Sequence, residues 1–212
     1  MISLDVAKAA IGAYANALGV RVFEPGDARV AFGLSLAKGI TALVPGGASV
    51  LGDMLSVFDK ATETVSVTLP APGGTVIILS KNAMAGGRAY YRTGLHELVH
   101  AGQISRVGGV QSAVDWLGSG ELRAEREAEA CAVSLWADFL VSGEVPSPDD
   151  ASVIKSSFYH LDPPDKAFAR GVVTSVLGSI ESGGVPSFAL AATSLAWLKK
   201  NAPEAIQVAD YR

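Results

Sequence analysis

Two histidines lie four residues apart in the stretch "LHELVHAGQ" at residues 95–103, and a glutamate follows the first of them. On a helix, His96 and His100 are one turn apart, so both rings leave the same side. That spacing lets one nitrogen of each ring reach a single ion at about 2.0–2.1 Å. Glu97 lies about 100° further round the helix. It is too far round to be a third ligand, but close enough to take a proton from a water on the metal. The pattern is typical of zinc hydrolases in which this glutamate is the general base.

A catalytic zinc site of this kind needs a third protein ligand, and "ELRAEREAEACAVSLWADFL" at residues 121–140 offers four glutamates. A helical wheel of this stretch has one apolar arc, formed by Ala128, Ala132, Leu135, Trp136 and Phe139. Glu125 falls in the middle of the arc, whereas Glu127 falls on the opposite side with other polar residues. Because an unpaired carboxylate on a buried face is costly, a metal ion would explain Glu125. The wheel therefore predicts Glu125 as the third ligand.

Two neighbours of Glu125 are interpreted from the same wheel. Glu129, one turn further on, is expected to accept the second ring N–H of a ligand histidine. Cys131 is expected to be a small buried residue away from the ligands. The alternative for Glu125 is a surface ion pair with a nearby arginine, which needs no apolar neighbours; the candidates are Arg92, Arg123 and Arg126.

"HELVH" followed some 25 residues later by "EREAEA" resembles the gluzincin metallopeptidases. Their third ligand is a glutamate in a Glu-x-x-Ala/Ser-Asp-like motif, which here reads Glu125 to Glu129, with a glutamate in the aspartate position. "EREAEACA" is similar to the ImmA/IrrE-type minimal metallopeptidases. "HELVHAGQ" resembles the His-Glu-x-x-His-x-x-Gln of peptidase domains found with phage-tail-like injection systems. The resemblance covers about residues 75–140 and implies a zincin-like fold with Zn²⁺ bound by His96, His100 and Glu125.

Two other zincin groups fit less well. Metzincins carry a further glycine and a third histidine or aspartate after the second histidine, where this chain has Gln103 and Arg106. Aspzincins take an aspartate shortly after the second histidine, and Asp115 is available, but the accompanying Gly-Thr and Tyr-Gly signature is missing.

The resemblance also implies a donor for the oxyanion of the tetrahedral intermediate. Thermolysin-like enzymes use a downstream histidine and tyrosine, which makes His160 and Tyr159 in "FYHLDPPD" candidates. The alternative for His160 is a cap at a helix end beside the prolines. Tyr90 and Tyr91, just before the motif, are alternative donors, and core packing is the other explanation for both.

The elements that must position these residues predict an α+β fold. "ETVSVTLP" and "TVIILS" read as a hairpin over about residues 63–80, and a short strand is expected at 20–24. Gly-rich and Pro-rich breaks separate the expected helices, which are 3–18, 27–38, 48–60, 89–105, 109–117, 121–142, 149–158, 164–182 and 187–200. We expect a zincin-like core over 1–145 with a helical extension over 146–212 packed on it, or one single domain.

The composition limits partners and location. Net charge is −4 with mixed signs, which argues against nucleic-acid binding. The apolar stretch at 30–52 is interrupted by Lys38, Pro45 and several glycines, so it gives no firm membrane signal. One cysteine, no evident signal peptide and no spanning helix predict a cytoplasmic protein, with phage or mobile-element association suggested by the resemblance alone.

The sequence thus predicts a zinc-dependent metallopeptidase acting on a peptide or protein substrate, with Glu97 as general base. The first alternative is a catalytically silent zincin-like domain with a structural or partner-binding role. The second is that the histidines bind nothing and the C-terminal helices form a partner-binding bundle.

Overall fold

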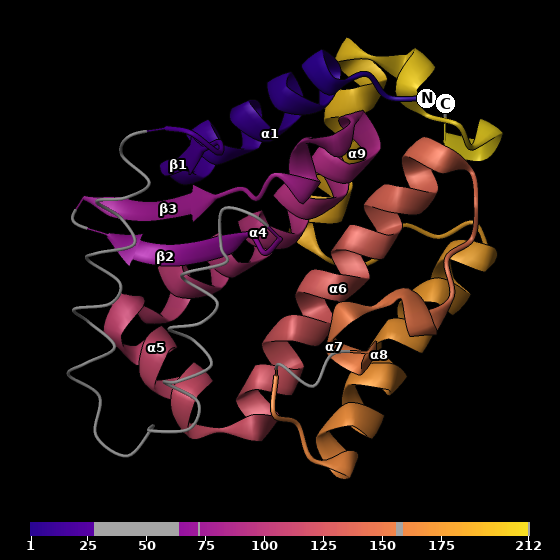
Figure 1. The fold of residues 1–212 in the computed structure, drawn as a ribbon. Coiled ribbons are helices and arrows are strands. Elements are labelled where there is room, and N and C mark those ends of the chain that lie inside the picture. Colours follow the sequence, from indigo (N-terminus) through magenta and orange to yellow (C-terminus); the bar gives the residue numbers. More distant parts are fainter. Residues whose placement is uncertain (28–63, 72, 156–158, 212) are drawn as a thin grey trace.

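The computed structural model describes residues 1–27, 64–71, 73–155 and 159–211. Their architecture is α+β, as predicted: a small sheet is followed by a mostly helical C-terminal part (Figure 1). The expected helices 27–38 and 48–60 lie outside the described residues. The described helices are α1 (Leu4–Leu18), α4 (Gly87–Val107), α5 (Gly109–Gly118), α6 (Gly120–Ser142), α7 (Ser152–Lys155), α8 (Pro163–Glu181) and α9 (Ala189–Asn201).

Three strands make up the described sheet, in the order β1-β3-β2. The expected hairpin is confirmed as β2 (Val67–Ala71) and β3 (Gly74–Ile78), which pair antiparallel. β1 (Val20–Phe23) pairs with β3 in parallel. Apart from its first residue, β3 is buried, as its continuous β-branched run predicts. In the order of the described strands, β2 lies at one edge of the sheet.

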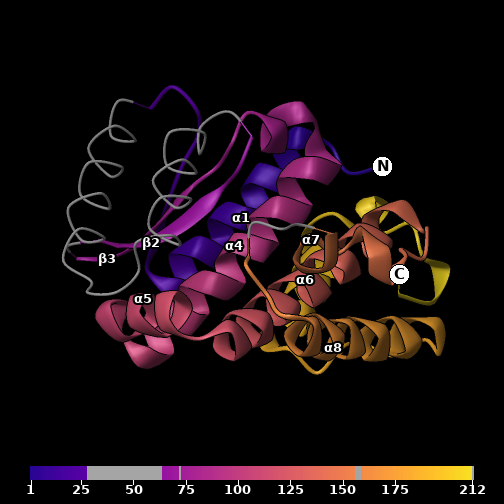
Figure 2. The same ribbon diagram turned by 60° about the horizontal axis from the view of Figure 1, so that its bottom comes forward.

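Helix α4, which carries the two histidines, packs between α1 and the sheet on one side and α6 on another (Figure 1). Apolar residues of α4 such as Leu95 and Leu98 are fully buried in the core. A turned view shows α8 covering α6, with α5 near the sheet end of α4 (Figure 2). The histidine helix is thus held on several sides.

Polar stripes of α4 and α6 face each other. Arg88 on α4 pairs with the buried Asp138 on α6, with 2.6 Å between Nε and Oδ1. Arg92, one turn further along α4, approaches the other oxygen of Asp138 at 3.6 Å. The next residues on this stripe of α4 are the two histidines. The α4–α6 contact is consequently a polar seam between apolar surfaces.

One cluster of buried apolar side chains extends from Ile2 on the N-terminal side to Tyr211 near the other end of the chain. Buried residues on both sides of position 145, such as Leu140 and Val173, belong to it. The boundary predicted at residue 145 stays a prediction. The shared core explains why α6 is buried on most of its sides.

Gly94 allows α1 to approach α4. A Cβ at this position would lie 2.7 Å from side-chain carbons of Ile11, which is itself 1% exposed. We expect Gly94→Ala to lower the free energy of unfolding by about 1–3 kcal/mol, because overpacking outweighs the better helix propensity of alanine. Gly102 on the same helix has nothing within 4 Å of such a Cβ. Gly102→Ala should therefore be neutral or stabilising by up to about 1 kcal/mol. Denaturant unfolding of both metal-free variants measures this, and equal stability of the two would contradict the packing argument.

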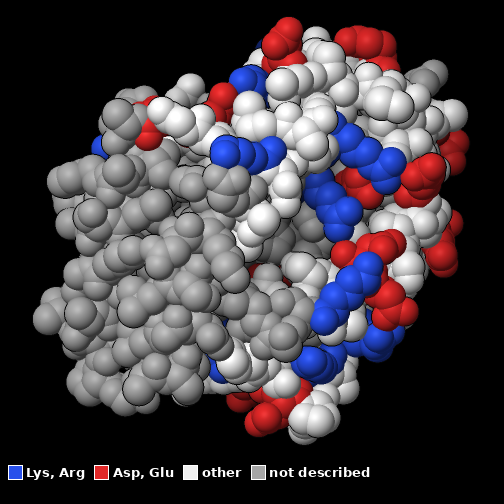
Figure 3. Space-filling view, in the orientation of Figure 1, with Lys and Arg blue, Asp and Glu red and all other residues white. Residues whose placement is uncertain are grey.

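No helix of the described residues is long and apolar enough to cross a membrane. On the face shown in Figure 3, basic and acidic side chains of the described residues alternate. This agrees with the mixed charges expected from the sequence.

Candidate metal centre

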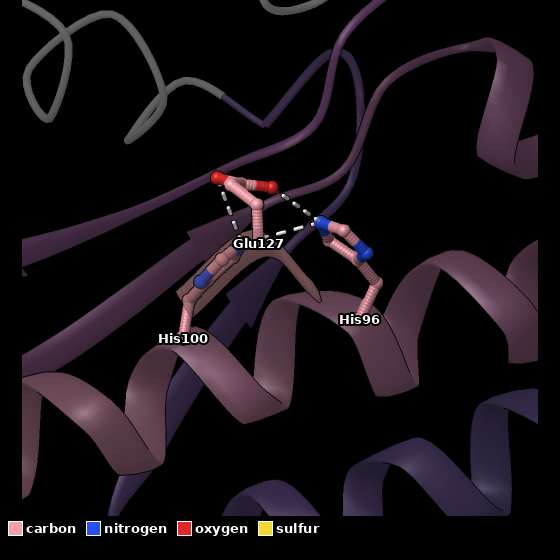
Figure 4. A group of neighbouring side chains, drawn as sticks. All are labelled: His96, His100 and Glu127. Atoms are coloured by element: carbon pink, nitrogen blue, oxygen red, sulfur yellow. Dashed lines mark hydrogen bonds and ion pairs between the residues drawn. The ribbon is translucent and has the colours of Figure 1, made fainter. Parts of the chain in front are cut away.

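His96, His100 and Glu127 come together where α4 meets α6 (Figure 4). The Nε2 atoms of the two rings are 3.2 Å apart. Glu127 Oε2 lies 3.5 Å from His96 Nε2, and Glu127 Oε1 lies 3.4 Å from His100 Nε2. Donor atoms placed tetrahedrally around one zinc ion at 2.0–2.1 Å are about 3.3 Å from one another. Glu127 turns a different oxygen toward each ring, and with one ligand atom from each residue the three atoms lie within 4.8 Å of one another, which is close enough for the side chains to converge on a single ion.

The electrostatics of this cluster favour a cation. Glu127 is 5% exposed, and its Oε2 accepts no hydrogen bond from the described residues. Two ring nitrogens that face each other repel unless a proton or cation lies between them. Burial raises the pKa of Glu127, but His100 and His96 lower it more, so the pKa stays well below its usual range. The residues present therefore fit a bound divalent metal.

The pKa values of the rings show the same demand for positive charge. Burial lowers the pKa of His96, but contacts with the Cys131 thiol and Glu127 overcome this and raise it well above its ordinary value. Burial likewise lowers the pKa of His100, but Glu127 raises it further. The contacts that raise the pKa of both rings would equally stabilise a bound cation, which would compete with protons for the ring nitrogens.

The prediction that Glu125 shares the buried face is wrong. Glu125 is exposed, and the carboxylate beside the histidines is that of Glu127, two residues further along α6. The wheel assumed that the buried arc of α6 is its apolar arc. In the structure the polar stripe is also buried, because it faces the polar stripe of α4.

Glu97 lies on α4 beside the cluster of His96, His100 and Glu127, and it is 5% exposed. Thr68 Oγ1 on β2 is 2.7 Å from Glu97 Oε2, to which it donates a hydrogen bond, and 3.0 Å from the Glu97 carbonyl oxygen. The hydroxyl has one proton and donates to one of these two oxygens at a time, and the shorter distance favours the carboxylate. Through this contact the edge strand positions the Glu97 carboxylate. Thr68 was not identified from the sequence, because a threonine in an alternating strand gives no signal of its partner.

A cavity of about 550 Å³ opens over the cluster. Its floor includes His96, Glu97, His100 and Glu127, and one wall is β2. Much of the remaining lining is apolar and comes from α4 and α5, including Ile104, Ala113, Trp116 and Leu117. Trp116 Nε1 lies 3.5 Å from Glu127 Oε1, so this tryptophan also contacts the cluster.

Of the two predicted oxyanion donors, Tyr159 lines the cavity and His160 does not. The Tyr159 hydroxyl lies 3.3 Å from Ser152 Oγ. Burial, followed by the nearby Glu127, raises the pKa of Tyr159 well above its ordinary value, so the phenol keeps its proton. His160 is exposed, has a left-handed backbone (φ 47°) and is not among the described cavity-lining residues, so the structure does not bring it to the cluster.

The remaining candidates are placed away from the cluster or touch it indirectly. Tyr90 donates a hydrogen bond to Glu24 and Asp115 pairs with Arg126, and no described hydrogen bond or ion pair joins either residue to the histidines. Cys131 is buried as expected, but it contacts His96 rather than lying off the ligand face. Within the described part of the chain, Glu129 is linked to His100 through Gln103.

Comparisons of the chain with protein-family models, with curated proteins and with solved structures give no match.

Proposed function

We propose that this protein is a zinc-dependent metallopeptidase in which His96, His100 and Glu127 hold the metal and Glu97 is the general base. The observation that carries the proposal is that two imidazoles and a carboxylate bring their ligand atoms within 4.8 Å of one another at the lining of a cavity, next to a further buried carboxylate. Two imidazoles and one carboxylate suit zinc better than magnesium or calcium. Three protein ligands leave the fourth position that a catalytic site needs.

When bound, zinc would polarise the scissile carbonyl and lower the pKa of a water molecule. Glu97 would accept the proton of the attacking water and pass it to the leaving amine. The hydrogen bond from Thr68 engages Oε2 of Glu97, and among the described residues no hydrogen bond engages Oε1, which would take part in this exchange. Because β2 and α4 both hold Glu97, its carboxylate needs little reorganisation before it acts.

The edge strand supports a peptide as the substrate. Val67, Thr68 and Leu69 of β2 line the cavity, and β2 is the edge of the described sheet on this side. Pro70 cannot donate a main-chain hydrogen bond and is tolerated in a strand where its nitrogen faces away from the partner strand. An extended peptide could pair with the outward groups of this edge. Its side chains would then lie against the apolar lining.

Tyr159 remains our candidate for the oxyanion donor, because its protonated hydroxyl lines the cavity. We expect Tyr159→Phe to lower kcat by roughly 10–100-fold with little change in KM, somewhat less than the loss of a fully preorganised donor. Tyr90→Phe is the matched control, since Tyr90 bonds Glu24 away from the cavity. Steady-state cleavage kinetics of both variants measure this. A kcat for Tyr159→Phe that equals that of the control would exclude the tyrosine from this role.

Cleavage of an unfolded protein such as reduced, alkylated casein tests the proposed activity. The zinc-loaded protein should produce fragments, a chelator should stop their formation, and added zinc should restore it. Cleavage that is indifferent to the chelator would contradict the proposal. Zinc binding without any cleavage would instead favour the silent zincin-like domain that binds a partner.

A further inference from the structure

The imidazole of His100 is held on its far side by a glutamine. His100 Nδ1 lies 2.9 Å from Gln103 Oε1, three residues further along α4. The amide nitrogen of Gln103 lies 3.1 Å from the carbonyl oxygen of Arg126 and 2.9 Å from Glu129 Oε2, both on α6. Gln103 is 4% exposed, so these contacts account for its buried polar atoms.

The partners on α6 decide which way the amide points. A backbone carbonyl and a carboxylate only accept hydrogen bonds, so the NH₂ group of Gln103 must face them. Its oxygen then faces His100, and an amide oxygen can only accept. The amide oxygen of Gln103 therefore favours the neutral ring form with its proton on Nδ1, whereas Glu127 Oε1, 3.4 Å from Nε2, competes for a proton on the other nitrogen. In the Nδ1–H form the bare Nε2 points to Glu127 and His96, where a metal ligand must present its lone pair.

We infer that Gln103 is a positioning residue, which fixes the Nδ1–H form of His100 and aims Nε2 into the cluster. Glu129 and the Arg126 carbonyl are the groups that prevent the amide from flipping. This use of Gln103 rests on the proposed metal site, although the ring form itself does not require a metal. Gln103 thus makes the contact with a histidine that was expected of Glu129, and Glu129 contacts Gln103 instead.

Gln103 lies between Glu129 and His100, so the negative charge of Glu129 does not contact the imidazole directly. On its solvent side, Glu129 Oε2 lies 3.2 Å from Arg106 Nη2, and this ion pair partly neutralises the carboxylate. Gln103 itself is neutral, so His100 is oriented without a carboxylate against its Nδ1. A carboxylate in direct contact would raise the basicity of the ligand more strongly.

Zinc affinity, measured by competition with a chelating dye, is the first test. Gln103→Leu should weaken binding by about 10–100-fold, as loss of a partner of a ligand histidine does. Glu129→Gln should weaken it less, because Gln103 can still donate to the Arg126 carbonyl and to the new amide oxygen. Gln111→Leu makes the same change at an exposed glutamine of α5 and should leave affinity unchanged.

Ring-nitrogen NMR of His100 gives a second readout that needs no metal. In metal-free Glu127→Ala, which lacks the competing carboxylate, His100 should be in the Nδ1–H form at a pH where the ring is neutral. Adding Gln103→Leu should move it toward the Nε2–H form that free histidine prefers. If Glu127→Ala does not fold, exchange of the His100 Nδ1 proton in the zinc-loaded chain, slow in wild type and faster in Gln103→Leu, replaces this comparison.

The outcomes separate the two proposals. An Nε2–H ring in the presence of Gln103, or equal zinc affinity of Gln103→Leu and Gln111→Leu, would overturn the role of Gln103. A wild-type chain that binds no zinc would end the proposed function, while the NMR comparison would still decide the ring form. Weaker zinc binding together with the shift of the ring form would support the inference.

Discussion

Replacing Glu97 by glutamine is expected to lower peptide cleavage by roughly 10²–10⁴-fold, the usual contribution of a general base. The amide has the same shape and can still accept the hydrogen bond from Thr68, but it cannot take a proton from water. Zinc content should be unchanged, because Glu97 is not one of the three grouped donors. Cleavage rates at equal zinc occupancy measure the effect.

The matched control for this variant is Glu125→Gln, which makes the same chemical change at an exposed position of α6. It should cleave at the wild-type rate. If the Glu97 and Glu125 variants cleaved equally fast, Glu97 would not be the base, whatever the metal does.

Glu127→Gln is expected to weaken zinc binding by more than about a hundredfold, since loss of a mere partner of a ligand already costs about 10–100-fold. Its carboxylate is the only acidic group in the described cluster, and an amide is a much poorer zinc ligand. Glu125→Gln should bind zinc as wild type does. Dye competition on both purified variants makes the comparison, with circular dichroism to verify that both are folded.

This pair also separates the two predictions made for the third ligand. A large loss of affinity in Glu125→Gln with none in Glu127→Gln would contradict the geometry of the cluster and favour the original wheel. Should Glu127→Gln fail to fold, Glu127→Asp keeps the charge and shortens the reach, and its weaker binding would serve the same comparison.

The parts of the fold with strong local signals were predictable from the sequence. The β-branched runs on either side of "APGG" predicted the hairpin, and glycines marked the ends of α1 and α6. The spacing of His96 and His100 needed only the helical repeat to bring the two rings to one side. These features depend on residues close together in the chain.

The third ligand depended on what surrounds α6, which the sequence did not reveal. Sixteen of its 23 residues are buried, so no single arc of a wheel identifies the face that meets α4. The arc built on Trp136 and Phe139 is only one of several buried sides. A wheel is informative for a helix with one exposed face, and α6 is not such a helix.

One signal in the sequence could have identified Glu127. On α4, polar residues recur every fourth position through Arg88, Arg92, His96 and His100. A buried polar stripe needs a complementary stripe on its neighbour. On α6, Glu127 and Asp138 lie on one side at helical spacing and supply the opposite charges. Matching the two stripes, rather than finding the apolar arc, would have selected the right carboxylate.

The metal content of the purified chain tests the central claim most directly. We predict about one equivalent of zinc per chain after purification in zinc-containing buffer, and a lower melting temperature once a chelator removes it, because a ligand that binds only the folded state stabilises it. The double variant His96→Ala/His100→Ala should hold none. Less than about a tenth of an equivalent in the wild-type chain, with a melting temperature unchanged by the chelator, would contradict the account.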